Sequence, residues 1–102
     1  MEKLLMITFR QSLEHDFAQK LHELEMKTYT MISGVSGMGE TGAAPSRFGW
    51  SGANSIIFLV LNEEQEKFVV EKLKAWHDQL AEHHPSLKVP MRIFVLPCSQ
   101  IL

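Results

Sequence analysis

Hydrophobic and polar positions follow two successive repeats along this chain, and each repeat predicts a strand, a helix and a second strand. In the first repeat, the short apolar run from Leu4 to Phe9 is typical of a buried strand. Apolar residues then recur at helical spacing from Leu13 to Leu24, which predicts an amphipathic helix with Ser12 as its N-cap. The β-branched and aromatic residues between Lys27 and Val35 predict the strand that completes the repeat.

The second repeat begins with a near-continuous apolar run from Ser55 to Leu61, the pattern expected of a strand that is covered on both faces. The segment from Asn62 to Gln65 has the form of a capping box and predicts the start of a helix. This helix must end before Pro85, because the residue that precedes a proline disfavours helical angles. The run from Val89 to Leu96 predicts a fourth strand, which Pro97 terminates. The apolar stripe of the second helix consists of Val69, Leu73, Trp76 and Leu80.

The order of these elements predicts an α+β fold of the ferredoxin-like β-α-β-β-α-β type. In this sandwich, two helices pack on one face of a four-stranded antiparallel sheet. One layer of helices covers only one face, although the run from Ser55 to Leu61 is apolar on both. We therefore expect a homo-oligomer whose subunits pack sheet against sheet. The length of 102 residues fits one domain that spans residues 1–102.

Composition and charge narrow the class of function. The net charge is -2 and the pI is about 6.2, so the chain lacks the basic field that direct binding to nucleic acid requires. The single cysteine, Cys98, has no partner for an internal disulfide, which favours a reducing, cytoplasmic setting. No apolar run approaches the ~20 residues of a membrane-spanning helix. No nucleophile is paired with a base in a recognisable motif, so we do not expect an enzyme.

All six glycines of the chain fall in one stretch, which predicts a flexible loop over about residues 34–54, between the second and third strands. Connections longer than about 12–15 residues are usually functional or disordered, so we expect function here. The loop contains Arg47, Phe48 and Trp50, which we expect to bind a partner, because Trp and Arg are typical interface anchors. The alternative is that the two aromatic side chains pack back on the protein itself.

The glycines at positions 37, 39 and 42 match the G-x-G-x-x-G pattern of dinucleotide-binding loops. The pattern follows a predicted strand, but it leads into further loop rather than into the helix that would hold a pyrophosphate. Two interpretations remain open. Either the backbone N–H groups converge into a nest that binds an anion such as phosphate or bicarbonate, or the glycines only permit turns.

Four segments together resemble the PII-like signalling superfamily, that of the nitrogen regulatory protein P-II. The segment from Tyr29 to Gly39 resembles the strand and the Gly-aromatic-Gly turn that open the long T-loop of these proteins. Ser55 to Leu61 and Asn62 to Trp76 are similar to the family's third strand and second helix, and Met91 to Pro97 is similar to its fourth strand. The resemblance implies a homotrimer with inward-facing sheets, ligand clefts between subunits, and regulation of a membrane transporter or an enzyme through the T-loop.

This sequence departs from typical members at the positions that bind ligand. The basic residue and the glutamine of the family's Gly-Phe-Gly-Arg-Gln run are absent here, and only Lys88 is comparable to the phosphate loop that precedes the fourth strand. We expect the effector to be an adenine nucleotide or bicarbonate, with no certain cofactor. The expected contacts are the backbone amides of Gly37, Met38, Gly39, Glu40 and Thr41, with positive charge from Lys88 and Arg92.

The five histidines leave a second function open, a metal-binding or metal-tolerance protein on the same trimeric scaffold. His15 and His22 stand two helical turns apart, too far to share one ion without other subunits, and a solvated helix face explains them better. His83 and His84 lie near the predicted helix end, where the helix dipole stabilises an imidazolium without any metal.

Overall fold

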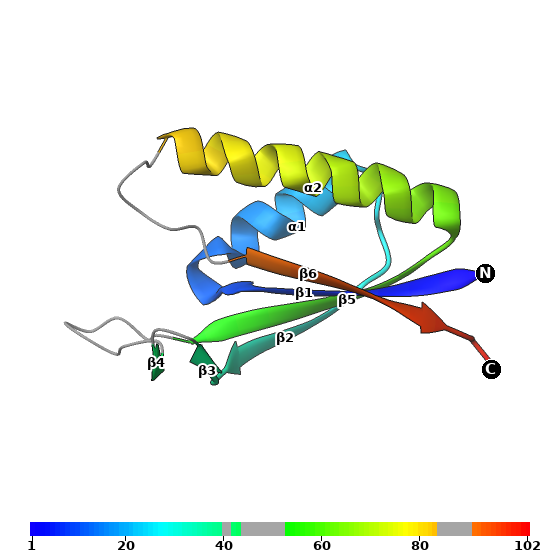
Figure 1. Cartoon of the computed structure of the whole chain (residues 1–102), viewed down its shortest axis with the longest axis horizontal. Helices are drawn as coiled ribbons and strands as arrows, with labels where there is room; N and C mark the ends of the chain where they lie inside the picture. The colour runs from blue at the N-terminus through cyan, green and yellow to red at the C-terminus, as the bar shows by residue number, and fades with distance from the viewer. Residues whose placement is uncertain (40–41, 44–52, 84–90) are drawn as a thin grey trace.

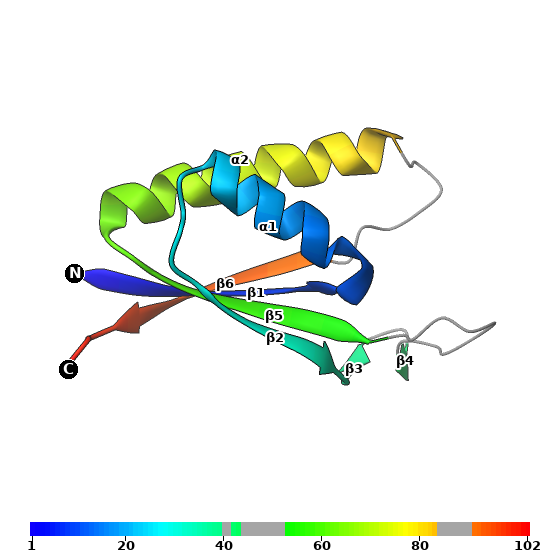
Figure 2. The same ribbon diagram turned by 180° about the vertical axis from the view of Figure 1, so that it is seen from behind.

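The computed structural model describes residues 1–39, 42–43, 53–83 and 91–102. Its main sheet is antiparallel, with the strand order β2-β5-β1-β6. Helices α1 (Glu14–Glu23) and α2 (Glu63–His83) lie on the same face of this sheet (Figures 1 and 2). The predicted ferredoxin-like α+β fold is therefore confirmed. The strands of the main sheet are β1 (Glu2–Arg10), β2 (Thr30–Val35), β5 (Asn54–Leu61) and β6 (Met91–Cys98).

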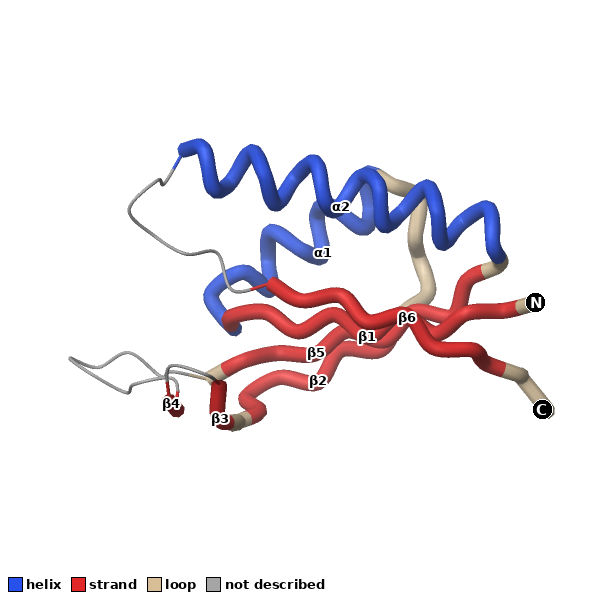
Figure 3. Tube along the Cα trace, in the orientation of Figure 1, coloured by secondary structure: helices blue, strands red, loops and turns tan. Residues whose placement is uncertain are grey.

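A short hairpin follows β2, formed by β3 (Met38–Gly39) and β4 (Gly42–Ala43). Figure 3 shows this hairpin at the end of the main sheet that is opposite the two chain termini. Strands β1 and β2 end there, and β5 and β6 begin there. We call this end, marked by Arg10, Val35, Asn54 and Met91, the hairpin end.

The core lies between the main sheet and the helices, because every second strand residue points toward α1 and α2. Phe17 of α1 joins the layers: its ring stacks on that of Phe9 at a centroid distance of 4.1 Å and meets the ring of Trp76 edge to face at 4.8 Å. Burying one such large apolar side chain contributes about 1.5–3 kcal/mol. The core residues, all at most 4% exposed, are Leu5, Ile7, Phe9, Phe17, Leu21, Ile57, Leu59, Leu61, Val69 and Leu73.

The other face of the main sheet is also apolar, and no described element covers it. Val60 and Phe94 leave 46% and 45% of their surface exposed on this face, so the chain's own helices do not cover this side of β5, and its coverage by a second subunit stays a prediction. The face alternates with the buried one because the pleat sends successive residues to opposite sides. We call it the open sheet face, and its apolar residues are Leu4, Met6, Ile32, Ile56, Phe58, Val60, Phe94 and Leu96.

The two helices begin differently. At α2 the predicted capping box is confirmed: the Gln65 N–H donates to Asn62 Oδ1 at 2.8 Å, and the Asn62 N–H donates to Gln65 Oε1 at 3.1 Å. The prediction of Ser12 as the N-cap of α1 is wrong. Ser12 lies in the 3-10 turn η1 (Gln11–Leu13), and Leu13 precedes α1 without any side-chain cap.

Two strand boundaries differ from the prediction. Strand β2 begins at Thr30 rather than Lys27. The strand propensity of the residues before Thr30 therefore does not determine where β2 starts to pair with β5. Strand β6 does not stop at Pro97 but continues to Cys98. An edge strand tolerates a proline, because the missing N–H can lie on the side without a neighbouring strand. Residues 89–90 of the predicted fourth strand lie outside the described residues.

The expectation of an irregular loop over residues 34–54 is wrong in part. Gly34 lies inside β2 with a φ of 70°, and the register with β5 shifts between Ile32 and Val35. A glycine with positive φ at such a shift is typical of a β-bulge. After this bulge, the β3–β4 hairpin adds further regular strand pairing. Gly42 lies in β4, so the G-x-G-x-x-G pattern does not lead directly into the helix that a dinucleotide-binding loop needs.

Candidate ligand-binding site

At the hairpin end, the end of β1 and the start of α1 lie next to both flanks of residues 34–54, the glycine-rich segment in which we expect function. Arg10 and Val35 both lie opposite Asn54 in the register of their strands. The backbone N–H of Gln11 donates to the carbonyl oxygen of Ala53 at 3.1 Å. The residues that leave and re-enter the sheet around the hairpin are thus held next to the β1–α1 connection.

A small polar network ties this connection to both flanks of the hairpin region. The hydroxyl of Ser55, on β5, donates to the carboxylate of Glu14, the first residue of α1. Ser55 is completely buried, and it is the polar side chain found in the described core. Hydrogen bonding from Ser33 on β2, and then from Ser55, lowers the pKa of Glu14, while burial acts weakly in the opposite direction. Glu14 therefore links α1 to the strands on either side of the hairpin.

The sequence alone does not predict this network. Glu14 and Ser55 are 41 positions apart, so no local spacing connects them. The one available signal is Ser55 itself, a hydroxyl at the start of an otherwise apolar strand, which needs a hydrogen-bond partner if it is buried.

The structure places part of the predicted ligand set at the hairpin end. Met38 and Gly39 form β3, and the Met38 side chain is 78% exposed. Among the described residues, space is open around Gly37, because a Cβ at this position would have none of their atoms within 4 Å. Arg92 is the second residue of β6 and is exposed on the open sheet face. The remaining predicted residues lie outside the described residues, and they are Glu40, Thr41, Lys88, Arg47, Phe48 and Trp50.

A separate groove of about 520 Å³ lies between α2 and β6, on the side of the helices. None of the described lining residues of this groove belongs to the predicted ligand set. His77 Nδ1 lies 3.6 Å from Asp78 Oδ1 along its wall. Its lining residues are Leu73, Lys74, His77, Asp78, Met91 and Ile93.

The described histidines are distributed over the two helices. His15 and His22 are both exposed on α1. His83 donates from Nδ1 to the carbonyl oxygen of Gln79 at 2.8 Å, in the last turn of α2. No group of three or more His, Cys, Asp or Glu side chains able to hold a metal ion occurs among the described residues. Likewise, no helix in the described part of the chain is both long and apolar enough to cross a membrane.

Comparison with known proteins identifies relatives of this fold. The family model of the nitrogen regulatory protein P-II matches residues 2–102. Among curated protein sequences, none matches the chain significantly.

Solved structures with a similar fold include CPII, a nitrogen regulatory PII-like protein from Thiomonas intermedia K12, bound to ADP, AMP and bicarbonate. It is 20% identical with a TM-score of 0.69, over 93% of this chain and 83% of CPII. The apo form of CPII is 16% identical with a TM-score of 0.58, over 93% and 88% of the two chains. A DUF3240 family protein from Shewanella baltica OS155 is 17% identical with a TM-score of 0.68, over 98% and 92%. These likenesses establish the fold.

Proposed function

Because the chain belongs to the nitrogen regulatory protein P-II family, we propose that it is a PII-like regulatory protein that senses a small anionic metabolite. The observation that carries this proposal is the match of the family model to residues 2–102. CPII, which has the same fold, binds ADP, AMP and bicarbonate, so the proposed effector is an adenine nucleotide or bicarbonate. The protein acts on a membrane transporter or an enzyme in the cytoplasm and catalyses no reaction itself.

The open sheet face supports assembly into a homotrimer. Its apolar side chains come from all the strands of the main sheet, and Val60, Phe94, Ile32 and Leu96 are each more than 40% exposed in the single chain. Large contiguous apolar patches are rare on monomers and mark interfaces. In the proposed trimer, the open sheet faces of the subunits pack against one another, and the ligand clefts lie between subunits beside the hairpin.

The proposed ligand contacts are the backbone amides from Gly37 to Thr41 and the positive charges of Lys88 and Arg92. Gly37 and Arg92 support this placement, since both lie near the hairpin end and neither is enclosed by the side chains that the structure describes. An effector that binds one conformation of residues 34–54 more tightly than the others shifts the population toward it. Arg47, Phe48 and Trp50 then present the signal to the regulated partner.

Isothermal titration calorimetry with ATP, ADP, AMP, cyclic AMP and bicarbonate tests the proposal. We expect at least one of these probes to bind, and light scattering after size-exclusion chromatography to give the mass of a trimer. After each nucleotide is incubated with the protein, we expect chromatography to recover it unchanged, because the proposed function involves no catalysis. Failure of the pure protein to bind any of the probes would count against the sensing function, and hydrolysis of a nucleotide would contradict the absence of catalysis.

A further inference from the structure

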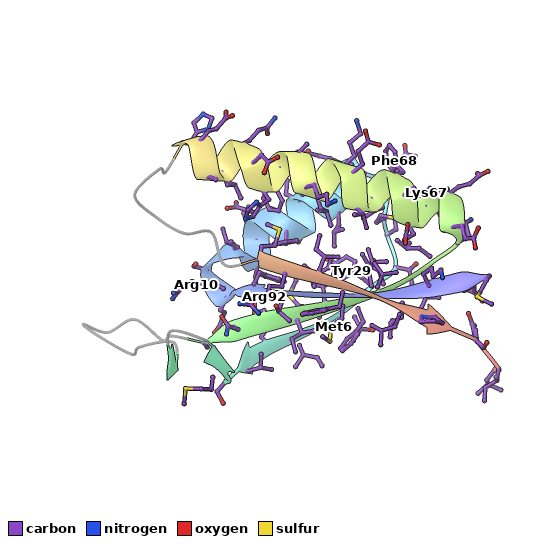
Figure 4. All side chains as sticks on the ribbon, viewed as in Figure 1. Met6, Arg10, Tyr29, Lys67, Phe68 and Arg92 are labelled. Atoms are coloured by element: carbon purple, nitrogen blue, oxygen red, sulfur yellow. The ribbon has the colours of Figure 1, made fainter. Side chains whose placement is uncertain are left out.

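Two of the three arginines in this chain, Arg10 and Arg92, lie on neighbouring strands at the hairpin end. Arg10 is the last residue of β1, and the register places Thr8 opposite Arg92. Since alternate residues of a strand point to the same face, both arginines lie with Thr8 on the open sheet face. They are diagonal cross-strand neighbours, which are about 7–8 Å apart in an antiparallel sheet. Figure 4 labels both side chains at this end of the sheet.

No acidic side chain pairs with either arginine in the part of the chain that the structure describes. An ion pair joins Lys20 to Glu23 there, and the imidazole of His77 lies 3.6 Å from the Asp78 carboxylate; both contacts are on helices. The strands of the main sheet hold one acidic residue, Glu2, which lies at the far end of β1. Neighbouring cations without a counter-ion repel each other, and an anion between them removes that repulsion.

Apolar side chains around Arg10 and Arg92 strengthen the hydrogen bonds that these arginines can donate to an anion. On the open sheet face, Thr8 lies next to Ile56, and Phe94 follows Arg92 along β6. Arg10 is half-buried, while Arg92 is exposed. Apolar neighbours lower the local dielectric constant, so a charge-assisted hydrogen bond is stronger there than at a fully solvated site.

Arg10 also adjoins the point at which the chain returns to the main sheet. Its partner in the register is Asn54, the first residue of β5, and the next residue, Gln11, is hydrogen-bonded to Ala53. An anion held by Arg10 therefore lies beside the flank of residues 34–54, the segment that carries the proposed signal.

We infer that Arg10 and Arg92 together form an oxyanion subsite of the effector site. The inference rests on the proposed function and adds Arg10 to the ligand set. Each guanidinium group presents a planar fork of N–H donors that matches a carboxylate or a phosphate in a bidentate manner. The group bound is thus either bicarbonate itself or a phosphoryl group of the nucleotide.

Calorimetry with bicarbonate, inorganic phosphate and ADP on four single variants tests the subsite. Arg10→Gln and Arg92→Gln are each expected to weaken binding of the oxyanion about tenfold to a hundredfold, because each removes a charged hydrogen-bond donor. Arg10→Lys keeps the charge without the fork, so an intermediate loss is expected. Lys3→Gln is the control, because it removes one positive charge from the opposite end of β1 and should leave affinity within about twofold.

The double variant Arg10→Gln/Arg92→Gln is expected to lose less than the product of the two single losses, since both side chains bind the same group. A loss confined to bicarbonate identifies the free anion as occupant, whereas a loss shared by phosphate and ADP identifies a phosphoryl group. If the unaltered protein binds a probe and Arg10→Gln binds it equally well, the subsite is wrong while the proposed function stands. Equal losses of affinity in Arg10→Gln and Lys3→Gln also overturn the proposed subsite, because they show that the anion responds only to the overall charge of the protein. If the unaltered protein binds no probe, both proposals fail.

Discussion

The two faces of the main sheet carry similar apolar side chains, yet only one of them is closed by the chain's own helices. On the covered face, Leu5, Ile7 and Ile57 are completely buried against α1 and α2. On the open sheet face, Val60 and Phe94 leave nearly half of their surface exposed. The difference arises because a single layer of helices covers one side of a sheet, whereas strand alternation supplies both sides with apolar residues. The covered face stabilises the subunit, and the open sheet face is the surface through which we propose that subunits associate.

The largest effect is expected from a cavity on the covered face. Phe17→Ala removes the ring that contacts both Phe9 and Trp76, and it should lower the free energy of unfolding by about 3–5 kcal/mol. Urea denaturation followed by circular dichroism measures this change. Phe68→Ala is the control, because Phe68 is 44% exposed on the outer side of α2 and its loss should cost no more than about 0.5 kcal/mol. Similar losses in the two variants would contradict the assignment of Phe17 to the core.

A charge on the open sheet face should act on assembly rather than on the fold. Phe94→Asp is expected to convert the proposed trimer into monomers, because an aspartate cannot be buried unpaired between apolar sheets. Light scattering after size-exclusion chromatography measures the mass, and circular dichroism checks that the fold is retained. Phe68→Asp is a matched control, since the two phenylalanines are 45% and 44% exposed. A trimer that survives in Phe94→Asp would place the interface elsewhere.

The smallest effect is expected at the polar edge of the covered face, where Glu14 contacts Ser55. The pKa of Glu14 is lowered in the folded state, so its ionised form stabilises the fold at pH values above the ordinary glutamate pKa of the unfolded state. That stabilisation is lost as the pH falls through the lower, folded-state pKa. Glu14→Gln should therefore be less stable than the unaltered protein near neutral pH, with a gap that narrows in acid.

Urea denaturation at a series of pH values measures the gap for Glu14→Gln. Asp16→Asn provides the control, because Asp16 is an exposed carboxylate on the same helix. A gap for Glu14→Gln that does not change with pH would show that the carboxylate charge is not what the two serines stabilise.

Much of the fold follows from patterns within a few residues. The apolar run of β1 and the capping box of α2 both depend on neighbours that are close in sequence. The capping box was predicted at the observed positions, and the predicted strand from Leu4 to Phe9 lies within β1. The predicted start of β2 and the predicted end of β6 were wrong, because those boundaries depend on pairing with the neighbouring strands β5 and β1. Gly37 and Arg92, two residues of the proposed ligand set, lie near the hairpin end, and their role in binding stays a prediction.

The order of the two helices and of the strands in the main sheet, the apolar nature of both sheet faces and the family were therefore determined by the sequence, because short-range periodicity and capping act between near neighbours. The β3–β4 hairpin was not predicted. Only the tertiary structure determines that Glu14 contacts Ser55 and that Arg10 lies diagonally across from Arg92. Those pairs are distant along the chain, and the pairing of whole strands, which no local pattern contains, brings them together.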